Sequence, residues 1–261
     1  MSGASDAAGV RSGMARIALV TGGSRGIGAA TARRLAADGW DVAISYRSRR
    51  QEADRVLDDC RALGVRALAV QADVGRDEEV VALFRAVDIG LGRLDALVNN
   101  AGIVGPKARV DELDAERIRS MFAVNVVGAF GCAREAVRRM STAFGGHGGV
   151  IVNVSSAAAR IGAPGEYVDY AASKAAIDTM TLGLAKEVAT EGIRVNGVRP
   201  GIVRTEIHAS GGQPDRIERI APLVPMQRAG EADEVAAAIA WLCRDEASYV
   251  TGAILDVSGG R

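Results

Sequence analysis

A tyrosine and a lysine, Tyr170 and Lys174, stand four residues apart in an alanine-rich stretch whose pattern predicts a helix. Residues at this spacing share one helix face, so a phenol and an ammonium group would lie one turn apart. Holding a tyrosine as its phenolate at neutral pH requires lowering its pKa by about three units, or about 4 kcal/mol. A fixed cation can supply much of that free energy. An isolated pair of this kind is usually a plain surface pair, so the rest of the chain has to decide.

A glycine-rich segment, residues 21–28, directly follows the first predicted strand and opens a predicted helix. This is the context in which a loop binds the phosphates of a dinucleotide. Glycine at positions 22, 26 and 28 permits a tight turn and a close approach of the backbone, and the N–H groups at the helix start attract a pyrophosphate. The spacing differs from the strict Gly-x-Gly-x-x-Gly fingerprint, so the loop alone does not settle cofactor binding.

Short apolar runs alternate with helical patterns to the end of the chain, which predicts an α/β fold. We expect one Rossmann-type, doubly wound parallel sheet of about seven strands with helices on both faces. The predicted strands are 16–21, 41–46, 66–72, 95–99, 150–155, 194–198 and 253–257. The predicted helices are 25–38, 52–63, 77–91, 114–142, 170–191 and 231–243.

The domain organisation follows from the same pattern. Residues 1–13 are small and polar and are predicted to form a disordered tail, with Met14 as an alternative start to Met1. Residues 14–261 are predicted to form one domain, in which 201–225 has no clear period and is expected to be a mobile flap over the substrate.

Composition narrows the function classes. Lys plus Arg and Asp plus Glu number 32 each, so the chain shows no electrostatic signature of a partner nucleic acid or an anionic membrane. No stretch approaches the ~18 apolar residues of a membrane span. The three cysteines lack Cys-x-x-Cys spacing, and His147 and His208 are the only histidines, which argues against a metal site and for a reducing, cytoplasmic setting.

Several motifs in order carry a family resemblance. Thr-Gly-x-x-x-Gly-x-Gly at 21–28, Asn-Asn-Ala-Gly at 99–102 and Tyr-x-x-x-Lys at 170–174 together resemble the classical short-chain dehydrogenase/reductase family. The resemblance covers nearly the whole chain after the tail. It implies an enzyme that transfers hydride between a nicotinamide cofactor and a carbonyl or alcohol carbon.

The resemblance assigns four catalytic residues. Tyr170 is implied as the general acid or base, and Lys174 as the cation that lowers the tyrosine pKa and binds the nicotinamide ribose. Ser156 is implied to donate a hydrogen bond to the substrate oxygen. Asn125 is implied to position a water in a proton relay that connects Lys174 to solvent.

Spacing decides between neighbouring candidates for two of these roles. Tyr167 has Ala171 four residues after it, so only Tyr170 has the lysine. Strand alternation lets only one of Ser155 and Ser156 face the cleft, and Ser156 matches the family position better. The interval from Ser156 to Tyr170 is about one residue longer than the commonest family spacing, which leaves the path of the loop between them open.

The dinucleotide is predicted from charge at the end of the second strand. An acid there would hydrogen-bond a ribose hydroxyl and repel a 2′-phosphate, and residues 45–48 contain none. We therefore predict NADP(H) in preference to NAD(H), with Arg25 and Arg47 as the phosphate contacts. Arg49 and Arg50 fit a solvated helix start better. The predicted cofactor-binding residues are Gly22, Ser24, Arg25, Gly26, Ile27, Gly28, Arg47, Asp73, Val74, Asn99, Ala101, Gly102, Tyr170, Lys174, Pro200, Gly201 and Thr205.

The substrate is left open between simple carbonyl compounds, sugars, polyols and 3-oxoacyl thioesters. Tyr167, Ile207 and His208 are the contacts expected from the loops around the nicotinamide end. A 3-oxoacyl-[acyl-carrier-protein] reductase is the alternative, with Arg138 and Arg139 to meet an acidic carrier, but the balanced charge does not favour it. A dinucleotide-sensing module without turnover is a second alternative. The resemblance also implies a homotetramer.

Overall fold

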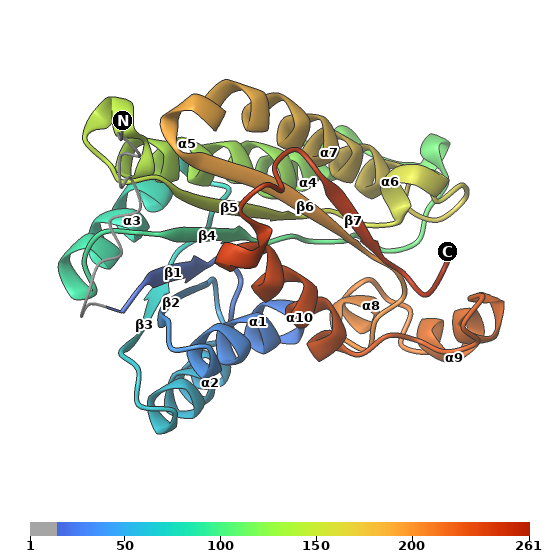
Figure 1. Ribbon diagram of the computed structural model, residues 1–261. Coiled ribbons are helices and arrows are strands. Elements are labelled where there is room, and N and C mark those ends of the chain that lie inside the picture. The colour runs from blue at the N-terminus through green and yellow to red at the C-terminus, as the bar shows by residue number, and fades with distance from the viewer. Residues whose placement is uncertain (1–14) are drawn as a thin grey trace, which may run out of the picture.

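The computed structural model describes residues 15–261, so the predicted tail and Met14 lie outside the described residues. Its centre is a seven-stranded parallel sheet in the order β3-β2-β1-β4-β5-β6-β7 (Figure 1). The strands are β1 (Ile17–Val20), β2 (Asp41–Tyr46), β3 (Ala67–Gln71), β4 (Ala96–Asn99), β5 (Gly149–Val154), β6 (Ile193–Pro200) and β7 (Ile254–Val257). The predicted fold class and all predicted strands are confirmed, with ends that differ by at most two residues.

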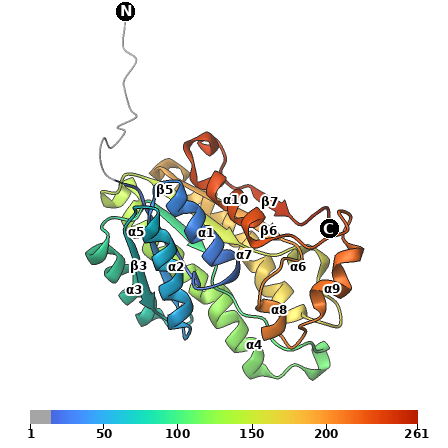
Figure 2. The ribbon, with the colours of Figure 1, turned by 90° about the horizontal axis from the view of Figure 1, so that it is seen from below.

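Helices cover both faces of the sheet. On one face lie α1 (Gly26–Ala37), α2 (Arg50–Ala62) and α10 (Ala232–Cys243), which face the viewer in Figure 2. On the other lie α3 (Asp77–Gly90), α5 (Gly128–Met140) and α7 (Val168–Val188), with α4 (Ala115–Phe122) leading into α5. This sandwich explains why the central strands β1, β4 and β5 are mostly apolar, since helices cover both of their faces.

Strand β1 shows how the period of two divides its side chains between the faces. Ala18 and Val20 belong to the core cluster under α1 and α10, whereas Ile17 and Leu19 belong to the cluster under α3 and α5. All four are buried. The strand order reverses on either side of β1 and β4, and in such sheets a crevice opens where the carboxyl ends of those two strands diverge.

The long predicted helix over 114–142 is interrupted. One π-helical turn, Ala123–Val127, joins α4 to α5, so the chain continues as a helix but gains width at this point. The sequence Ala-Val-Asn-Val-Val contains neither proline nor glycine and gives no sign of a break. Asn125 lies in the middle of this turn and is fully buried.

The predicted flap 201–225 contains regular structure that its sequence did not indicate. Two short helices, α8 (Ile207–Ser210) and α9 (Arg216–Ile220), lie at the carboxyl edge of the sheet beyond α10 (Figure 1). A further short helix, α6 (Ala158–Ile161), follows β5. The expected mobility of the flap stays a prediction.

Candidate active site

The loop after β1 and the chain after β4 are tied together at the crevice. The Thr21 hydroxyl accepts hydrogen bonds from the backbone N–H groups of Asn100 and Ala101, both at 3.0 Å. In return, Asn100 Nδ2 donates to the carbonyl oxygens of Thr21 at 2.9 Å and Gly22 at 3.1 Å. These bonds fix the separation between the two loops before any ligand is considered.

The glycines of residues 21–28 meet steric demands that other residues would not. Gly22 and Gly26 have φ values of +63° and +53°, in the left-handed region that favours glycine. A Cβ on Gly28 would lie 2.5 Å from the Gly22 carbonyl oxygen and 2.4 Å from Asn100 Nδ2. The loop therefore keeps its backbone open toward the crevice at the start of α1, which fits the cradle that a pyrophosphate needs.

Two arginines flank the part of this crevice beside the glycine loop. Arg47 follows β2, its side chain is 64% exposed, and its guanidinium lies 4.0 Å from the Asp73 carboxylate. Arg25, inside the glycine loop, donates to the Ser210 hydroxyl of α8 at 3.5 Å. Both arginines line the crevice, where a phosphate would meet them. Arg49 pairs with an acid of its own helix turn at 3.1 Å, as does Arg50, in agreement with a solvated helix start.

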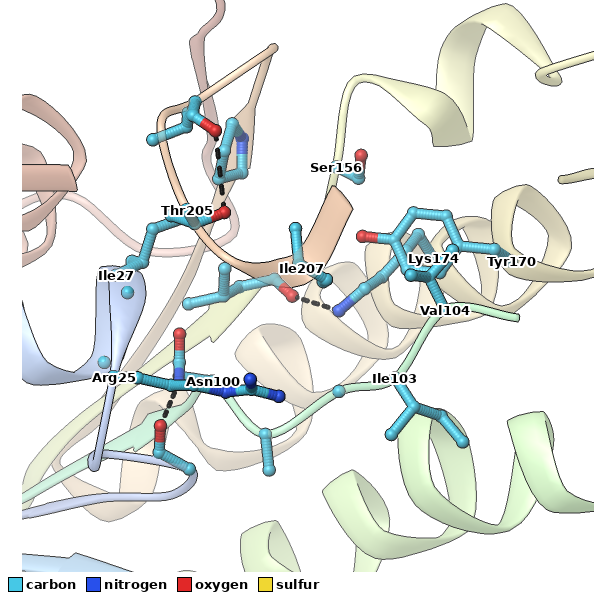
Figure 3. Close-up of a pocket in the computed structure, with 18 of the residues that line it drawn as sticks. Arg25, Ile27, Asn100, Ile103, Val104, Ser156, Tyr170, Lys174, Thr205 and Ile207 are labelled. Carbon is cyan, nitrogen blue, oxygen red and sulfur yellow. Dashed lines mark hydrogen bonds between the residues drawn. The ribbon is translucent and has the colours of Figure 1, made fainter. Parts of the chain in front are cut away.

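The tyrosine and lysine lie at the other end of the same crevice. Figure 3 shows the Tyr170 hydroxyl directed toward Ser156, with Lys174 one turn further along α7. The Lys174 ammonium donates to the Val154 carbonyl oxygen at 2.8 Å and lies 5.8 Å from the centre of the Tyr170 ring. The Ser155 hydroxyl donates to the Lys174 carbonyl oxygen at 3.1 Å and so holds α7 against β5. Ser156 is therefore the serine that faces the Tyr170 hydroxyl.

Burial governs the electrostatics of this pair. It raises the pKa of Tyr170, while a hydrogen bond with Ser156 and the charge of Arg216 lower that pKa. It also lowers the pKa of Lys174 from 10.5 to about 8, against the opposing charge of Asp178. Lys174 is still mainly cationic at pH 7, and Tyr170 is mainly a phenol. Lys174 is not among the groups that lower the pKa of Tyr170 here, so the predicted lowering by Lys174 stays a prediction.

Asn125 lies behind the crevice and not in it. Its Oδ1 accepts from the Ile103 N–H at 2.8 Å, and its Nδ2 donates to the Ile103 carbonyl oxygen at 3.0 Å. The Nδ2 also reaches Met121 Sδ and Ser173 Oγ, both at 3.1 Å. These bonds hold the chain after β4 against α7, so the structure shows a scaffolding role, and the predicted water-positioning role stays a prediction.

The crevice is one continuous cleft with a volume of ≈ 330 Å³ that runs from the glycine loop to Tyr170. Comparison with known proteins connects this geometry to a family. A family model described as Enoyl-(Acyl carrier protein) reductase matches residues 22–261. An uncharacterised oxidoreductase of Escherichia coli, YgfF, is 56% identical over 94% of this chain and 99% of its own. The chain belongs to the short-chain dehydrogenase/reductase family.

Two further comparisons agree with this membership. The 3beta-hydroxysteroid dehydrogenase 1 of Eggerthella lenta is 42% identical over 93% of this chain and 92% of its own. A crystal structure of a short-chain dehydrogenase of Burkholderia cenocepacia in complex with NADP superposes with a TM-score of 0.87, at 38% identity over 95% of this chain and 98% of that chain. As a member of the family, the protein is an oxidoreductase that acts on CH–OH and C=O groups.

The structure brings most of the predicted site residues together and corrects one. Every predicted catalytic or cofactor-binding residue lines the cleft except Asn125 and Asn99. The Asn99 side chain is buried inside the sheet, where it donates to the Ala129 carbonyl oxygen and to Asn153 Oδ1, both at 3.1 Å. Asn99 is the last residue of β4 and its side chain points toward α5, so its neighbour Asn100 lines the cleft in its place.

Sequence reasoning pointed to the loops around this end of the cleft but did not single out a second set of residues that line it. These come from the chain after β4, from α6 and the loop behind it, and from the flap. They include Asn100, Ile103, Val104, Ala158, Ile161, Ala163, Ile202 and Arg216. The predicted contacts Tyr167 and Ile207 do line the cleft, whereas the side chain of His208 lies outside the described part of the chain.

Residues 15–261 contain neither a candidate membrane span nor a candidate metal cluster. No helix there is long and apolar enough to span a bilayer. No group of three or more His, Cys, Asp or Glu side chains there is arranged to hold a metal ion.

Proposed function

We propose that the protein is an NADP(H)-dependent oxidoreductase that interconverts a carbonyl and an alcohol, with Tyr170 as the general acid and base. The observation that carries the proposal is the shared cleft. Ser156, Tyr170 and Lys174 lie at one end, and a glycine cradle flanked by Arg25 and Arg47 lies at the other. When bound across this cleft, the nicotinamide would supply or accept the hydride.

Charge at the end of β2 supports NADP(H) over NAD(H). No acid follows this strand, and Arg47 is exposed there beside the cleft. Its contact with Asp73 is long, at 4.0 Å, so a 2′-phosphate could displace it at little cost. The NADP bound by the Burkholderia relative, at 38% identity, supports the same choice.

The residues at the nicotinamide end are suited to moving one proton. In the reducing direction Tyr170 would donate its hydroxyl proton to the substrate oxygen, and its raised pKa keeps that proton in place until it is needed. Ser156 would hold the same oxygen and stabilise the charge that develops on it. The Lys174 cation, fixed by the Val154 carbonyl, would stabilise the phenolate that remains.

The experiment that tests the proposal compares two tyrosines. Tyr170→Phe should lower turnover of a carbonyl panel with NADPH by about 10²- to 10⁴-fold, because proton transfer contributes that much. NADPH binding, followed by fluorescence titration, should change by less than about threefold. Tyr167→Phe is the matched control and should keep turnover within about tenfold. Near wild-type turnover by the Tyr170 variant would remove the proton-transfer assignment.

The alternatives predict other outcomes of the same assay. No turnover of any carbonyl or alcohol by the wild-type protein, with intact NADPH binding, would favour a dinucleotide-sensing module. The carrier-protein alternative receives no support from Arg138 and Arg139, because Arg138 pairs with Glu135 at 2.9 Å, and Arg139 pairs with Glu135 and Asp88, both at 2.8 Å. Their charges are largely neutralised before any acidic partner arrives.

Exposed apolar residues support a proposal for the oligomeric state, and the cysteines support one for the cellular location. We expect a homotetramer, because Val127 of the π-helical turn, Phe130 of α5 and Leu182 of α7 are exposed apolar residues. Tyr249 and Leu255 give β7 and its approach a similar surface. A monomeric mass by light scattering would contradict this assembly. The cysteines are buried and unpaired, as suits a reducing cytoplasm.

A further inference from the structure

One arginine of the flap reaches the catalytic end of the cleft. Arg216 is the first residue of α9, its side chain is only 11% exposed, and it lines the cleft together with Tyr170. Its positive charge lowers the pKa of Tyr170, which places it within electrostatic range of the reacting hydroxyl. The catalytic role of Tyr170 under the proposed function does not require this residue.

Arg216 is held in place from two sides. Its Nη1 donates to Glu166 Oε2 at 2.5 Å, and its guanidinium carbon lies 4.9 Å from the centre of the Tyr167 ring. The Tyr167 hydroxyl is in turn hydrogen-bonded by Gln213 of the flap, which also accepts a hydrogen bond from Arg219. A charge-assisted hydrogen bond and a stacked ring restrict the orientation of the guanidinium, so the guanidinium is already oriented before a ligand binds.

The guanidinium keeps both charge and donors available. Glu166 also lies 3.6 Å from Arg219, so one carboxylate is shared between two arginines and the cluster retains a net positive charge. Nη1 is the only side-chain nitrogen of Arg216 with a hydrogen-bond partner among the side chains and backbone that the structure describes. A guanidinium has five N–H donors, so several remain for a substrate.

Apart from Ser155, Ser156, Tyr167, Tyr170 and Lys174, this end of the cleft has mainly aliphatic walls. Its walls come from the chain after β4, from α6 and its loop, and from α8: Val104, Ala158, Ile161, Ala163 and Ile207. Lys174, Arg261 and Glu206 are also charged lining residues. Glu206 lies near Gly26 at the phosphate end, with its Oε2 3.9 Å from where a Gly26 Cβ would be. A buried guanidinium beside aliphatic walls favours a substrate oxygen that can accept its hydrogen bonds.

Resting on the proposed function, we infer that Arg216 binds a second oxygen close to the reacting carbonyl. The preferred substrates are then carbonyl compounds that carry a neighbouring carbonyl, hydroxyl or carboxylate oxygen, and simple ketones are poor substrates. Arg216 acts as a specificity-determining residue. Its hydrogen bond forms with the substrate, while Tyr170 and Ser156 handle the reacting oxygen.

Three substrates with four carbons each test the inference: 2-butanone, 2,3-butanedione and 2-oxobutanoate. The wild-type protein should show the highest kcat/KM for the two compounds with a second oxygen. Arg216→Gln should lower kcat/KM for those two by about ten- to a hundredfold, the range expected when a charged hydrogen bond is lost. The value for 2-butanone should change by less than about threefold. If kcat/KM falls more for 2-oxobutanoate than for 2,3-butanedione, the preferred second group is anionic. If kcat/KM falls equally for these two substrates, Arg216 binds a neutral acceptor.

Arg219→Gln is the matched control, since Arg219 lies on the same helix and contacts the same carboxylate but does not line the cleft. Because Arg219 shares Glu166 with Arg216, its loss should lower the preference for a second oxygen, but by much less than Arg216→Gln does. Arg216→Lys should keep part of the preference. Equal losses on all three substrates, or no loss on any, would overturn the inference while leaving the proposed function intact. Unchanged NADPH binding by Arg216→Gln would show that the cleft is still folded. Absence of turnover in the wild-type protein would refute the proposed function itself.

Discussion

Replacing Gly28 by alanine tests the close approach of the two loops at the head of the cleft. The added Cβ would lie 2.5 Å from the Gly22 carbonyl oxygen and 2.4 Å from Asn100 Nδ2. Real Cβ atoms essentially never come this close, so something has to move. The Gly22 oxygen belongs to the backbone, and Asn100 Nδ2 is held by bonds of 2.9 Å and 3.1 Å. Neither group is the free end of a flexible side chain.

The magnitude follows from three contributions. Losing the two Asn100 side-chain bonds costs about 1 kcal/mol each. Overpacking of a close contact adds about 1–3 kcal/mol. Alanine regains about 1 kcal/mol relative to glycine inside a helix. The free energy of unfolding should therefore fall by about 2–4 kcal/mol, which for a chain of this size lowers the Tm by about 5–15 °C.

The assay combines thermal unfolding with NADPH titration, and Gly131→Ala is the matched control. Gly131 is also a buried helical glycine, but a Cβ there would meet its nearest atom, Asp77 Oδ1, at 3.5 Å. We expect the control to stabilise the protein by about 0.5–1 kcal/mol. The Gly28 variant should also bind NADPH at least about tenfold more weakly. A Gly28→Ala protein with wild-type Tm and NADPH affinity would show that the loops do not need this approach.

Three other outcomes are expected. Arg47→Asp should shift the ratio of NADPH to NADH efficiency at least about tenfold toward NADH, and an unchanged ratio would show that another residue reads the 2′-phosphate. The kcat/KM for NADPH should fall as the pH rises through about 8, because buried Lys174 loses its proton there. Asp178→Asn should move that fall to lower pH, because it removes the charge that raises the pKa of Lys174. Asp169→Asn should lower the free energy of unfolding by about 3–5 kcal/mol, measured by denaturant unfolding. The variant leaves the Arg117 cation without the buried carboxylate that it contacts at 2.8 Å. A loss below about 1 kcal/mol would contradict this.

Local patterns were sufficient to predict the scaffold. Each strand is a short apolar run bounded by turn residues, and burial on both faces is what makes such runs continuous. The glycine loop and the Tyr170 to Lys174 pair are also local signals, since four residues fix a helix face. For these features the sequence distance between interacting groups is short, which is why prediction succeeded.

The features that were missed depend on contacts between residues far apart in the sequence, or on helices that are very short. Helices α8 and α9 have four and five residues, too few to show a helical period. Whether Asn99 or Asn100 lines the cleft depends on the residue at which β4 ends, and strand ends are the least certain part of such a prediction. Arg216 lies 46 residues beyond Tyr170, and only the path of the flap brings it to the cleft.

The π-helical turn at Ala123–Val127 sets a rotational phase within the helix that runs from α4 to α5. A wider turn takes up one residue more than an α-helical turn, and each residue of an α-helix corresponds to a rotation of about 100°. Deleting a single residue here would restore regular winding and rotate every later side chain of α5 by that angle. Either Asn125 would lose its hydrogen bonds with the Ile103 backbone, or the buried face of α5 would turn away from the sheet. A length change of one residue in this buried stretch is therefore much less tolerable than several inserted in the flap.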